Sequence, residues 1–174
     1  MEPSTLLYQT PWLALHRIGT WDFVRRPHSD ACVGILAITD QHEIILVEQH
    51  RIPVGKRVIE VPAGLIGDEI QHAHQSPIEV AHRELLEETG YHAAHIVPLI
   101  SSPTSAGMTS ETIHLFHATC LTRVSEGGGV AGENITTHLI PLKNLRTWLT
   151  QKRNEGLLVD FKIHAALAEA NIPF

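Results

Sequence analysis

Glu84, Glu87 and Glu88 are the residues whose type and spacing point most directly to chemistry. They stand at i, i+3 and i+4, so in a helix they are neighbours on one face, with Cβ atoms roughly 5–6 Å apart. Like charges this close destabilise a bare helix, and Arg83 is the only strong base between residues 76 and 91. Clusters of carboxylate oxygens hold hard divalent cations such as Mg²⁺. The pattern indicates a metal site on a helix; a solvated charged face is the simpler alternative.

The helix that would carry these glutamates has its own start and stop signals within residues 76–91, SPIEVAHRELLEETGY. Ser76 is a favourable N-cap and Pro77 suits the first helical position. Glu79 completes a Ser-x-x-Glu capping box, and Gly90 stands where a left-handed C-terminal cap would end the helix. The apolar residues at helical spacing predict the face that packs on the core: Ile78, Ala81 and Leu85.

Residues 83–91, RELLEETGY, match the second half of the Nudix box, G-x5-E-x7-R-E-U-x-E-E-x-G-U, position for position. The first half departs from the pattern. Ten residues separate Gly64 from the position of the first box glutamate, which makes the loop five residues longer, and Gln75 stands there instead of glutamate. In the family that glutamate mainly supports the site, so we expect the change to affect metal affinity. The chain nevertheless resembles the Nudix hydrolases.

The resemblance covers most of residues 20–170. Within the family, the chain is most similar to the subgroup of ADP-ribose pyrophosphatases and nucleotide-sugar pyrophosphatases. The segments that carry it outside the box are 21–26 (WDFVRR), 48–64 (EQHRIPVGKRVIEVPAG), 101–111 (SSPTSAGMTSE) and 132–142 (GENITTHLIPL). They imply a substrate in which a nucleoside diphosphate is linked to a sugar or ribose phosphate.

The resemblance also implies roles for single residues. The metal, Mg²⁺ with Mn²⁺ as an alternative, would be held by Glu84, Glu87, Glu88 and the backbone carbonyl of Ala63. Glu87 would be a ligand or activate the attacking water. A general base is implied on the loop before the last strand, where Glu133 is the candidate and Glu126 its competitor. Three residues of the motif would be structural: Gly64, Arg83 and Gly90.

Substrate contacts are implied for Trp21, Arg26, Arg51, Met108 and Glu111. Each has a plainer alternative. Arg51 could form only a surface salt bridge, Met108 could simply pack in its loop, and Trp21 could belong to the core or to an interface.

The composition fits one globular domain over residues 1–174, with 43% hydrophobic residues. A net charge of −6 gives no electrostatic footprint for nucleic acid. Two cysteines, Cys32 and Cys120, are too few for a disulfide framework, which favours the reducing cytoplasm. We find no apolar run long enough for a membrane span and no pattern of a signal peptide.

The remaining elements predict an α/β fold. The continuous apolar run at 31–38 is typical of a buried central strand. Further strands are expected at 43–51, 58–61, 95–100, 112–121 and 135–142. A Pro-Ala-Gly turn is expected at 62–64, and helices are expected at 142–152 and 159–170. Residues 1–27 would add short antiparallel strands. The resemblance implies the Nudix α/β/α sandwich with a mixed sheet, and a homodimer in which the N-terminal strands are the candidate dimerisation element.

Three functions agree with these observations. The first is Mg²⁺-dependent hydrolysis of ADP-ribose or a nucleotide sugar to a nucleoside monophosphate and a sugar phosphate. The second is a nucleotide-binding sensor that does not hydrolyse its ligand. The third is an enzyme acting on nucleoside triphosphates or dinucleoside polyphosphates. The intact Glu84, Glu87 and Glu88 favour an enzyme over a sensor.

Overall fold

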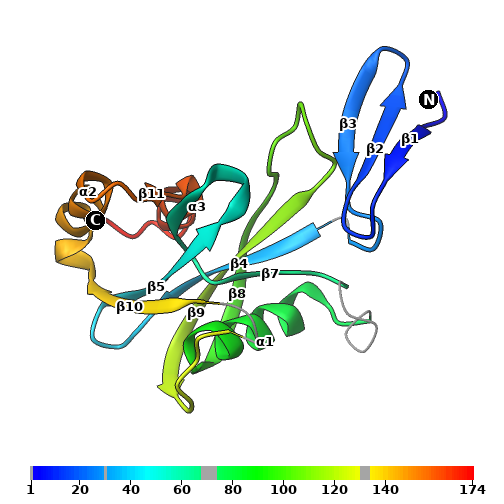
Figure 1. The fold of residues 1–174 in the computed structure, drawn as a ribbon. Helices are drawn as coiled ribbons and strands as arrows, with labels where there is room; N and C mark the ends of the chain where they lie inside the picture. Colours follow the sequence, from blue (N-terminus) through cyan, green and yellow to red (C-terminus); the bar gives the residue numbers. More distant parts are fainter. Residues whose placement is uncertain (1, 30, 68–73, 130–133) are drawn as a thin grey trace.

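The computed structural model describes residues 2–29, 31–67, 74–129 and 134–174. A large mixed sheet forms the centre of the molecule (Figure 1). Its strands are β4 (Ala31–Ile38), β5 (Glu43–Arg51), β6 (Lys56–Glu60), β7 (Ala63–Leu65), β8 (Tyr91–Pro103), β9 (Thr112–Arg123), β10 (Thr136–Pro141) and β11 (Leu158–Val159). Within the described part of the chain the order is β11-β6-β5-β4-β9-β8, with β10 paired to β5 and β7 paired to β4. The pairs β4–β9 and β11–β6 are parallel and the other pairs are antiparallel.

Helices cover both faces of this sheet, as the alternation of side chains along a strand requires. On one face α1 (Pro77–Thr89) packs against β4 and β5. The buried residues of that layer are Val33, Ile35, Ala37, Ile45, Val80, Ala81, Leu85, Ala93, Ile96, Phe116 and Ala118. On the other face lie α2 (Leu145–Asn154) and α3 (Phe161–Glu169). That layer buries Leu36, Ile38, Ile44, Leu46, Leu145, Leu149, Ile163 and Leu167. The predicted α/β/α sandwich is therefore confirmed.

The helix α1 begins and ends where its capping residues predict. The carboxylate of Glu79 accepts a hydrogen bond from the backbone N–H of Ser76 at 2.7 Å. Gly90 adopts a left-handed conformation with φ of 77°, and its N–H donates to the carbonyl of Leu86 at 2.8 Å. One residue of the predicted apolar stripe is misplaced, because Ile78 is exposed and Val80 takes its place in the core.

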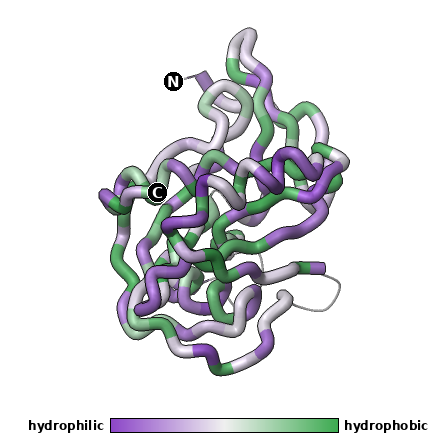
Figure 2. Tube along the Cα trace, turned by 90° about the vertical axis from the view of Figure 1, so that its left-hand side faces the viewer, coloured by the Kyte–Doolittle hydropathy of each residue, from purple (hydrophilic) through white to green (hydrophobic). Residues whose placement is uncertain are grey.

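A separate three-stranded antiparallel sheet precedes the large one. Its strands are β1 (Thr5–Gln9), β2 (Ala14–Ile18) and β3 (Trp21–Arg25), in that order. It stands away from the main body at the upper right of Figure 1, and hydrophobic stretches are visible in it at the top of Figure 2. Its exposed apolar side chains include Leu6, Leu7, Tyr8, Trp12 and Trp21. The predicted N-terminal antiparallel extension is thus present.

Several element boundaries differ from the sequence prediction. Residues 63–65 form the short strand β7 rather than a turn, because they pair with Cys32–Gly34 of β4. The strand β8 is longer than expected, since it pairs along β9 from Tyr91 to Pro103 with one register shift between Pro98 and Ile100. Residues 142–144 form a 3-10 turn (η3, Leu142–Asn144) before α2, and residues 158–159 are strand before α3. A further 3-10 turn, η1 (Ile52–Val54), follows β5. No helix in the described ranges is long and apolar enough to cross a membrane.

Candidate active site

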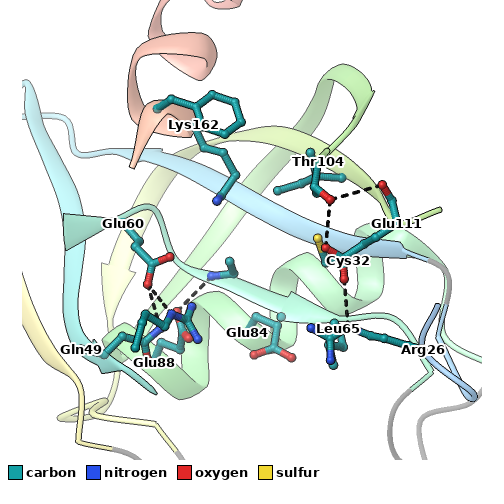
Figure 3. Close-up of a pocket in the computed structure, with 15 residues that line it drawn as sticks. Arg26, Cys32, Gln49, Glu60, Leu65, Glu84, Glu88, Thr104, Glu111 and Lys162 are labelled. Carbon is teal, nitrogen blue, oxygen red and sulfur yellow. Dashed lines mark hydrogen bonds and ion pairs between the residues drawn. The ribbon is translucent and has the colours of Figure 1, made fainter. Parts of the chain in front are cut away.

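A pocket of about 530 Å³ opens between α1, the strands β4 to β7 and the first turn of α3 (Figure 3). Its size is that of a ligand pocket, about 300–1,000 Å³. It is lined by Arg26, Cys32, Gln49, Arg51, Glu60, Ala63, Gly64, Leu65, Glu84, Glu88, Thr104, Glu111, Ile113, Phe161 and Lys162. Six residues predicted from sequence to contact metal or substrate are among them: Arg26, Arg51, Ala63, Glu84, Glu88 and Glu111.

The carboxylates of Glu84 and Glu88, one helical turn apart on α1, face the strand β7. The backbone N–H of Ala63 donates a hydrogen bond to the Oε2 atom of Glu88 at 3.0 Å, and Glu88 is buried. Glu84 lies directly beneath Gly64: a Cβ on Gly64 would lie 1.9 Å from the carboxyl carbon of Glu84. Only glycine at position 64 leaves room for the carboxylate of Glu84 in this position.

Arg83 ties the acidic face of α1 together. Its guanidinium forms ion pairs with Glu84 at 2.8 Å and with Glu87 at 2.9 Å. Its Nε also donates to the side-chain oxygen of Gln75 at 3.2 Å. Gln75, which replaces the first box glutamate, thus keeps a hydrogen bond to the arginine but brings no negative charge. Glu84 lines the pocket, whereas Glu87 is not among the lining residues.

The C-terminal end of α1 is held by the loop that follows β9. The N–H groups of Gly128 and Gly129 donate to the carbonyls of Glu88 at 2.8 Å and Glu87 at 3.0 Å. Carbonyls in the last turn of a helix have no partner within the helix, so the loop satisfies them. Gly127 packs so closely here that a Cβ on it would lie 2.4 Å from the backbone carbon of Thr89.

A second charged group lies on the far side of the pocket, on the loop after β8. Arg26 pairs with Glu111 at 2.9 Å, and the hydroxyl of Thr104 donates to the same carboxylate at 3.2 Å. Burial, with a smaller contribution from the Glu111 carboxylate, raises the pKa of the Cys32 thiol to about 12. Cys32 is therefore a protonated, unreactive wall residue at neutral pH.

Arg51 and Glu60 form a third charged group at the end of β5 and β6. Arg51 donates to the buried carboxylate of Glu60 at 2.7 Å, and the amide of Gln49 donates to the same oxygen at 3.2 Å. Gln49 and Glu60 are labelled at the left of Figure 3. Arg51 lines the pocket with its charge paired to the carboxylate of Glu60.

Other predicted site residues lie outside the pocket. Trp21 is at the β2–β3 turn of the N-terminal sheet and is 61% exposed, and Met108 is 66% exposed. The backbone of Met108 instead bonds β3, since its carbonyl accepts from the N–H of Val24 at 2.8 Å. Glu126 is exposed and pairs with Arg123 at 3.1 Å. Glu133, the candidate base, lies outside the described residues.

The pocket also contains residues that sequence reasoning did not single out: Cys32, Gln49, Glu60, Thr104, Phe161 and Lys162. Gln49 and Glu60 lie within residues 48–64, a segment that resembles the ADP-ribose pyrophosphatases. This resemblance was the one sequence signal that could have indicated them. Nothing in the local pattern of residues 158–170 indicated that the start of this helix returns to the site.

A hard divalent ion is the cofactor that the glutamates imply. Among the described residues no three or more His, Cys, Asp or Glu side chains are grouped to hold an ion. The carboxylates of Glu84 and Glu88 nevertheless line the pocket beside Ala63, and with the carbonyl that the resemblance implies at Ala63 they would make an all-oxygen donor set. Mg²⁺ uses such sets, taking one or two carboxylates and keeping several waters. The cradle that Gly64 leaves for Glu84 is a further fit, so the residues suit a divalent cation.

The model of the NUDIX domain family matches residues 28–157. The chain therefore belongs to the Nudix domain family.

Individual relatives agree with this family. The chain is 33% identical to the ADP-sugar pyrophosphatase of Mus musculus over 173 residues, covering 87% of this chain and 75% of that protein. It is 35% identical to the ADP-ribose pyrophosphatase of Bacillus subtilis over 105 residues, 60% of this chain and 52% of that protein. A methanol dehydrogenase activator of Bacillus methanolicus is 38% identical over 109 residues, 63% of this chain and 55% of that protein. The matches to these two bacterial proteins span about half of their length.

The fold is shared with a solved structure described as an ADP compounds hydrolase. The TM-score is 0.74 at 18% sequence identity, and the superposition covers 97% of this chain and 90% of that one. At this identity the likeness extends to the fold alone.

Proposed function

We propose that this protein is a divalent-metal-dependent hydrolase of the pyrophosphate bond in a nucleoside diphosphate linked to a sugar or ribose phosphate, with ADP-ribose or a nucleotide sugar as substrate. The observation that carries the proposal is the pocket in which the carboxylates of Glu84 and Glu88 face Ala63 and Gly64. The printed names of relatives, ADP-ribose, ADP-sugar and GDP-mannose pyrophosphatases, support the same substrate class.

Mg²⁺ is the proposed ion, with Mn²⁺ as the alternative, held by Glu84, Glu88 and the carbonyl of Ala63. When bound, it would neutralise the phosphate oxygens and lower the pKa of a water molecule. The need for a cation follows from the pocket itself. Its lining carries Glu60, Glu84, Glu88 and Glu111 against Arg26, Arg51 and Lys162, and a pyrophosphate would add further negative charge.

The chain's own residues bind the substrate and hold protons. The oxygen of water attacks one phosphorus, the P–O bond to the bridging oxygen breaks, and that oxygen leaves with the other phosphate. The water gives up its protons to a base and to solvent. Glu87 and Glu133 are the proposed acceptors. In the structure the guanidinium of Arg83 pairs with the carboxylate of Glu87 at 2.9 Å, which fixes the direction of that carboxylate.

We also infer that the protein acts as a homodimer in the cytoplasm. The apolar side chains exposed on β1 to β3 are the surface that a second copy would cover, and exposed apolar patches of this kind mark interfaces. Trp21 and Met108 would then contact substrate in the partner's pocket or at the dimer interface rather than in their own pocket.

The test measures product release in Mg²⁺ from ADP-ribose, GDP-mannose and a nucleoside triphosphate, with products separated by ion-exchange chromatography. We expect a nucleoside monophosphate and a sugar phosphate from a diphosphate substrate. Glu84→Gln and Glu88→Gln should each lower kcat/KM by about 100-fold or more, since each removes charge from the metal site. Glu155→Gln, a glutamate on the exposed end of α2, is the matched control and should act like the wild type.

Two results would contradict the proposal. Pyrophosphate released from the triphosphate, with no cleavage of any diphosphate sugar, would instead support an enzyme for nucleoside triphosphates. Binding of ADP-ribose without any cleavage would support a sensor.

A further inference from the structure

The first turn of α3 lies beside the active-site pocket although it is more than seventy residues from the box glutamates in the sequence. The short strand β11 pairs with β6 in parallel, Val159 opposite Ile59. The next residue, Asp160, donates its N–H to the carbonyl of Ile59 at 2.9 Å. Because Glu60 follows Ile59, α3 begins next to the Arg51–Glu60 pair. The family match ends at residue 157, so this turn lies beyond it.

Lys162 has a different setting from the other two cations of the pocket. Arg26 is paired with Glu111 and Arg51 with Glu60, and both of these carboxylates line the pocket. The partner of Lys162 is Asp160, the N-cap of its own helix, which is not among the described lining residues. Among the described cations that line the pocket, Lys162 is thus the one whose carboxylate partner is not itself a lining residue.

The position of Lys162 is fixed from two sides. Its backbone N–H donates to the Oδ1 atom of Asp160 at 2.8 Å, and its ammonium also pairs with the other carboxylate oxygen. The ammonium lies 5.5 Å from the centre of the Phe161 ring, within the range of a cation–π contact. In Figure 3 the side chain of Lys162 descends from α3 into the pocket, with Glu84 and Glu88 on the opposite side.

The charge of Lys162 acts across the cavity. It lowers the pKa of the Cys32 thiol, opposing the effects of burial and of Glu111, and its partner Asp160 has a smaller effect of opposite sign. Cys32 is on β4, on another wall of the same pocket. An anion placed between these walls would therefore feel the positive charge of Lys162.

We propose that Lys162 is a substrate-binding residue, which pairs with one phosphoryl group of the pyrophosphate linkage from the wall opposite Glu84 and Glu88. This deepens the proposed function and rests on it. A phosphate that enters the pocket would exchange its water shell for the ammonium and for the metal on the other side. The pairing is charge-assisted and is made equally in the ground state and the transition state, so it sets affinity rather than the chemical step.

The chain provides a matched control for this lysine. Lys152 on α2 also pairs with a carboxylate in its own helix, that of Glu155 at 2.9 Å, and lies 5.6 Å from the centre of the Trp148 ring. It does not line the pocket. Lys162→Met and Lys152→Met therefore remove the same charge, a similar ion pair and a similar ring contact, but only one of them removes a cation from the site.

The experiment measures the Kd of methylenediphosphonate, a pyrophosphate analogue with a P–C–P link that water does not cleave, by titration calorimetry in Mg²⁺ and again in EDTA. Lys162→Met should raise Kd at least about 10-fold under both conditions and weaken its dependence on salt. Lys162→Arg should stay within about 3-fold of the wild type. With the diphosphate substrate, Lys162→Met should raise KM at least about 10-fold and change kcat less than about 3-fold.

A Lys162→Met protein that is folded and has the Kd and KM of the wild type would overturn the proposal, as would an equal effect of Lys152→Met. The two proposals fail separately. If the wild type cleaves no diphosphate substrate but Lys162→Met still loses the diphosphonate, the proposed reaction is wrong and the assignment of Lys162 stands. If the wild type cleaves the substrate and Lys162→Met is unchanged, only the assignment of Lys162 is wrong.

Discussion

At the scale of single residues, the contact between Gly64 and Glu84 decides where a ligand carboxylate can lie. Gly64 is in β7, opposite Val33 of β4, so its backbone position is fixed by the sheet. Glu84 occupies the space that a side chain at position 64 would need. The glycine of the box is therefore explained by close approach of a side chain and not by its backbone conformation.

We expect Gly64→Ala to damage the site more than the fold. The clashing atoms are the end of a flexible side chain, so the carboxylate of Glu84 can swing aside at small cost in stability. The displaced ligand should raise the Mg²⁺ concentration for half-maximal activity by about 10-fold or more. The measurement is activity against Mg²⁺ concentration, together with the urea midpoint of unfolding.

Gly107→Ala is the control for this variant, because a Cβ there meets nothing within 4 Å. It should leave both quantities unchanged. A Gly64→Ala protein with wild-type activation by Mg²⁺ would show that Glu84 does not hold the ion.

At the scale of elements, the loop after β9 and the end of α1 behave as one unit. The backbones of Gly90 and Gly127 are in close contact. The backbone N–H groups of Gly128 and Gly129 donate hydrogen bonds to carbonyls in the last turn of the helix. The loop therefore places the helix end that carries Glu87 and Glu88. The end of the helix also contacts β10, where the hydroxyl of Thr137 donates to the carbonyl of Glu88 at 3.2 Å.

Gly127→Ala should destabilise the protein, because its Cβ would meet the backbone of Thr89 and not a movable side chain. Its φ of 69° adds the cost of a left-handed alanine, about 1–2 kcal/mol. We expect a total loss of about 2–4 kcal/mol in the free energy of unfolding, measured by urea denaturation.

The loss at Gly127 can be divided into its two parts with Gly156→Ala. Gly156 also has a positive φ, 92°, but a Cβ there would meet nothing within 4 Å. It should lose only the backbone part. Equal losses in the two variants would mean that the loop can move away from α1 and does not hold it.

At the scale of the whole molecule, the N-terminal sheet of β1 to β3 stands apart from the core of the main sheet. Backbone hydrogen bonds attach it to the loop that follows β8. The N–H of Val24 donates to the carbonyl of Met108 at 2.8 Å, and the N–H of Ser110 donates to the carbonyl of Val24 at 3.3 Å. Its own apolar side chains remain exposed. In the proposed homodimer, a second copy of the chain covers this surface.

Sedimentation equilibrium should therefore give a mass near twice 19.3 kDa. The double variant Tyr8→Ser, Trp12→Ser should shift the protein toward the monomer, since it removes two large exposed side chains from the proposed interface. Val97→Ser, which changes an exposed apolar residue of β8, should not. A wild-type monomer at micromolar concentration would exclude this dimer.

The sequence by itself determined the family and much of the frame. The strands at 31–38 and 43–51 have the predicted bounds. The first is a continuous apolar run, which identifies a strand that is buried on both faces. The helix α1 has its predicted caps, because capping depends on residues three or four positions apart. The RELLEETG motif identified the Nudix family, which the match over residues 28–157 confirms.

Only the tertiary structure decided how these parts form a site. Spacing placed Glu84, Glu87 and Glu88 on one face, yet in the structure Glu84 and Glu88 line the pocket and Glu87 does not. The tertiary structure turned the expected Pro-Ala-Gly turn into a strand, and it brought Lys162 to the pocket through the pairing of β11 with β6. Local patterns depend on residues within about one helical turn or one strand. Pairings between segments far apart in the sequence depend on how the whole core packs, and no local pattern records them.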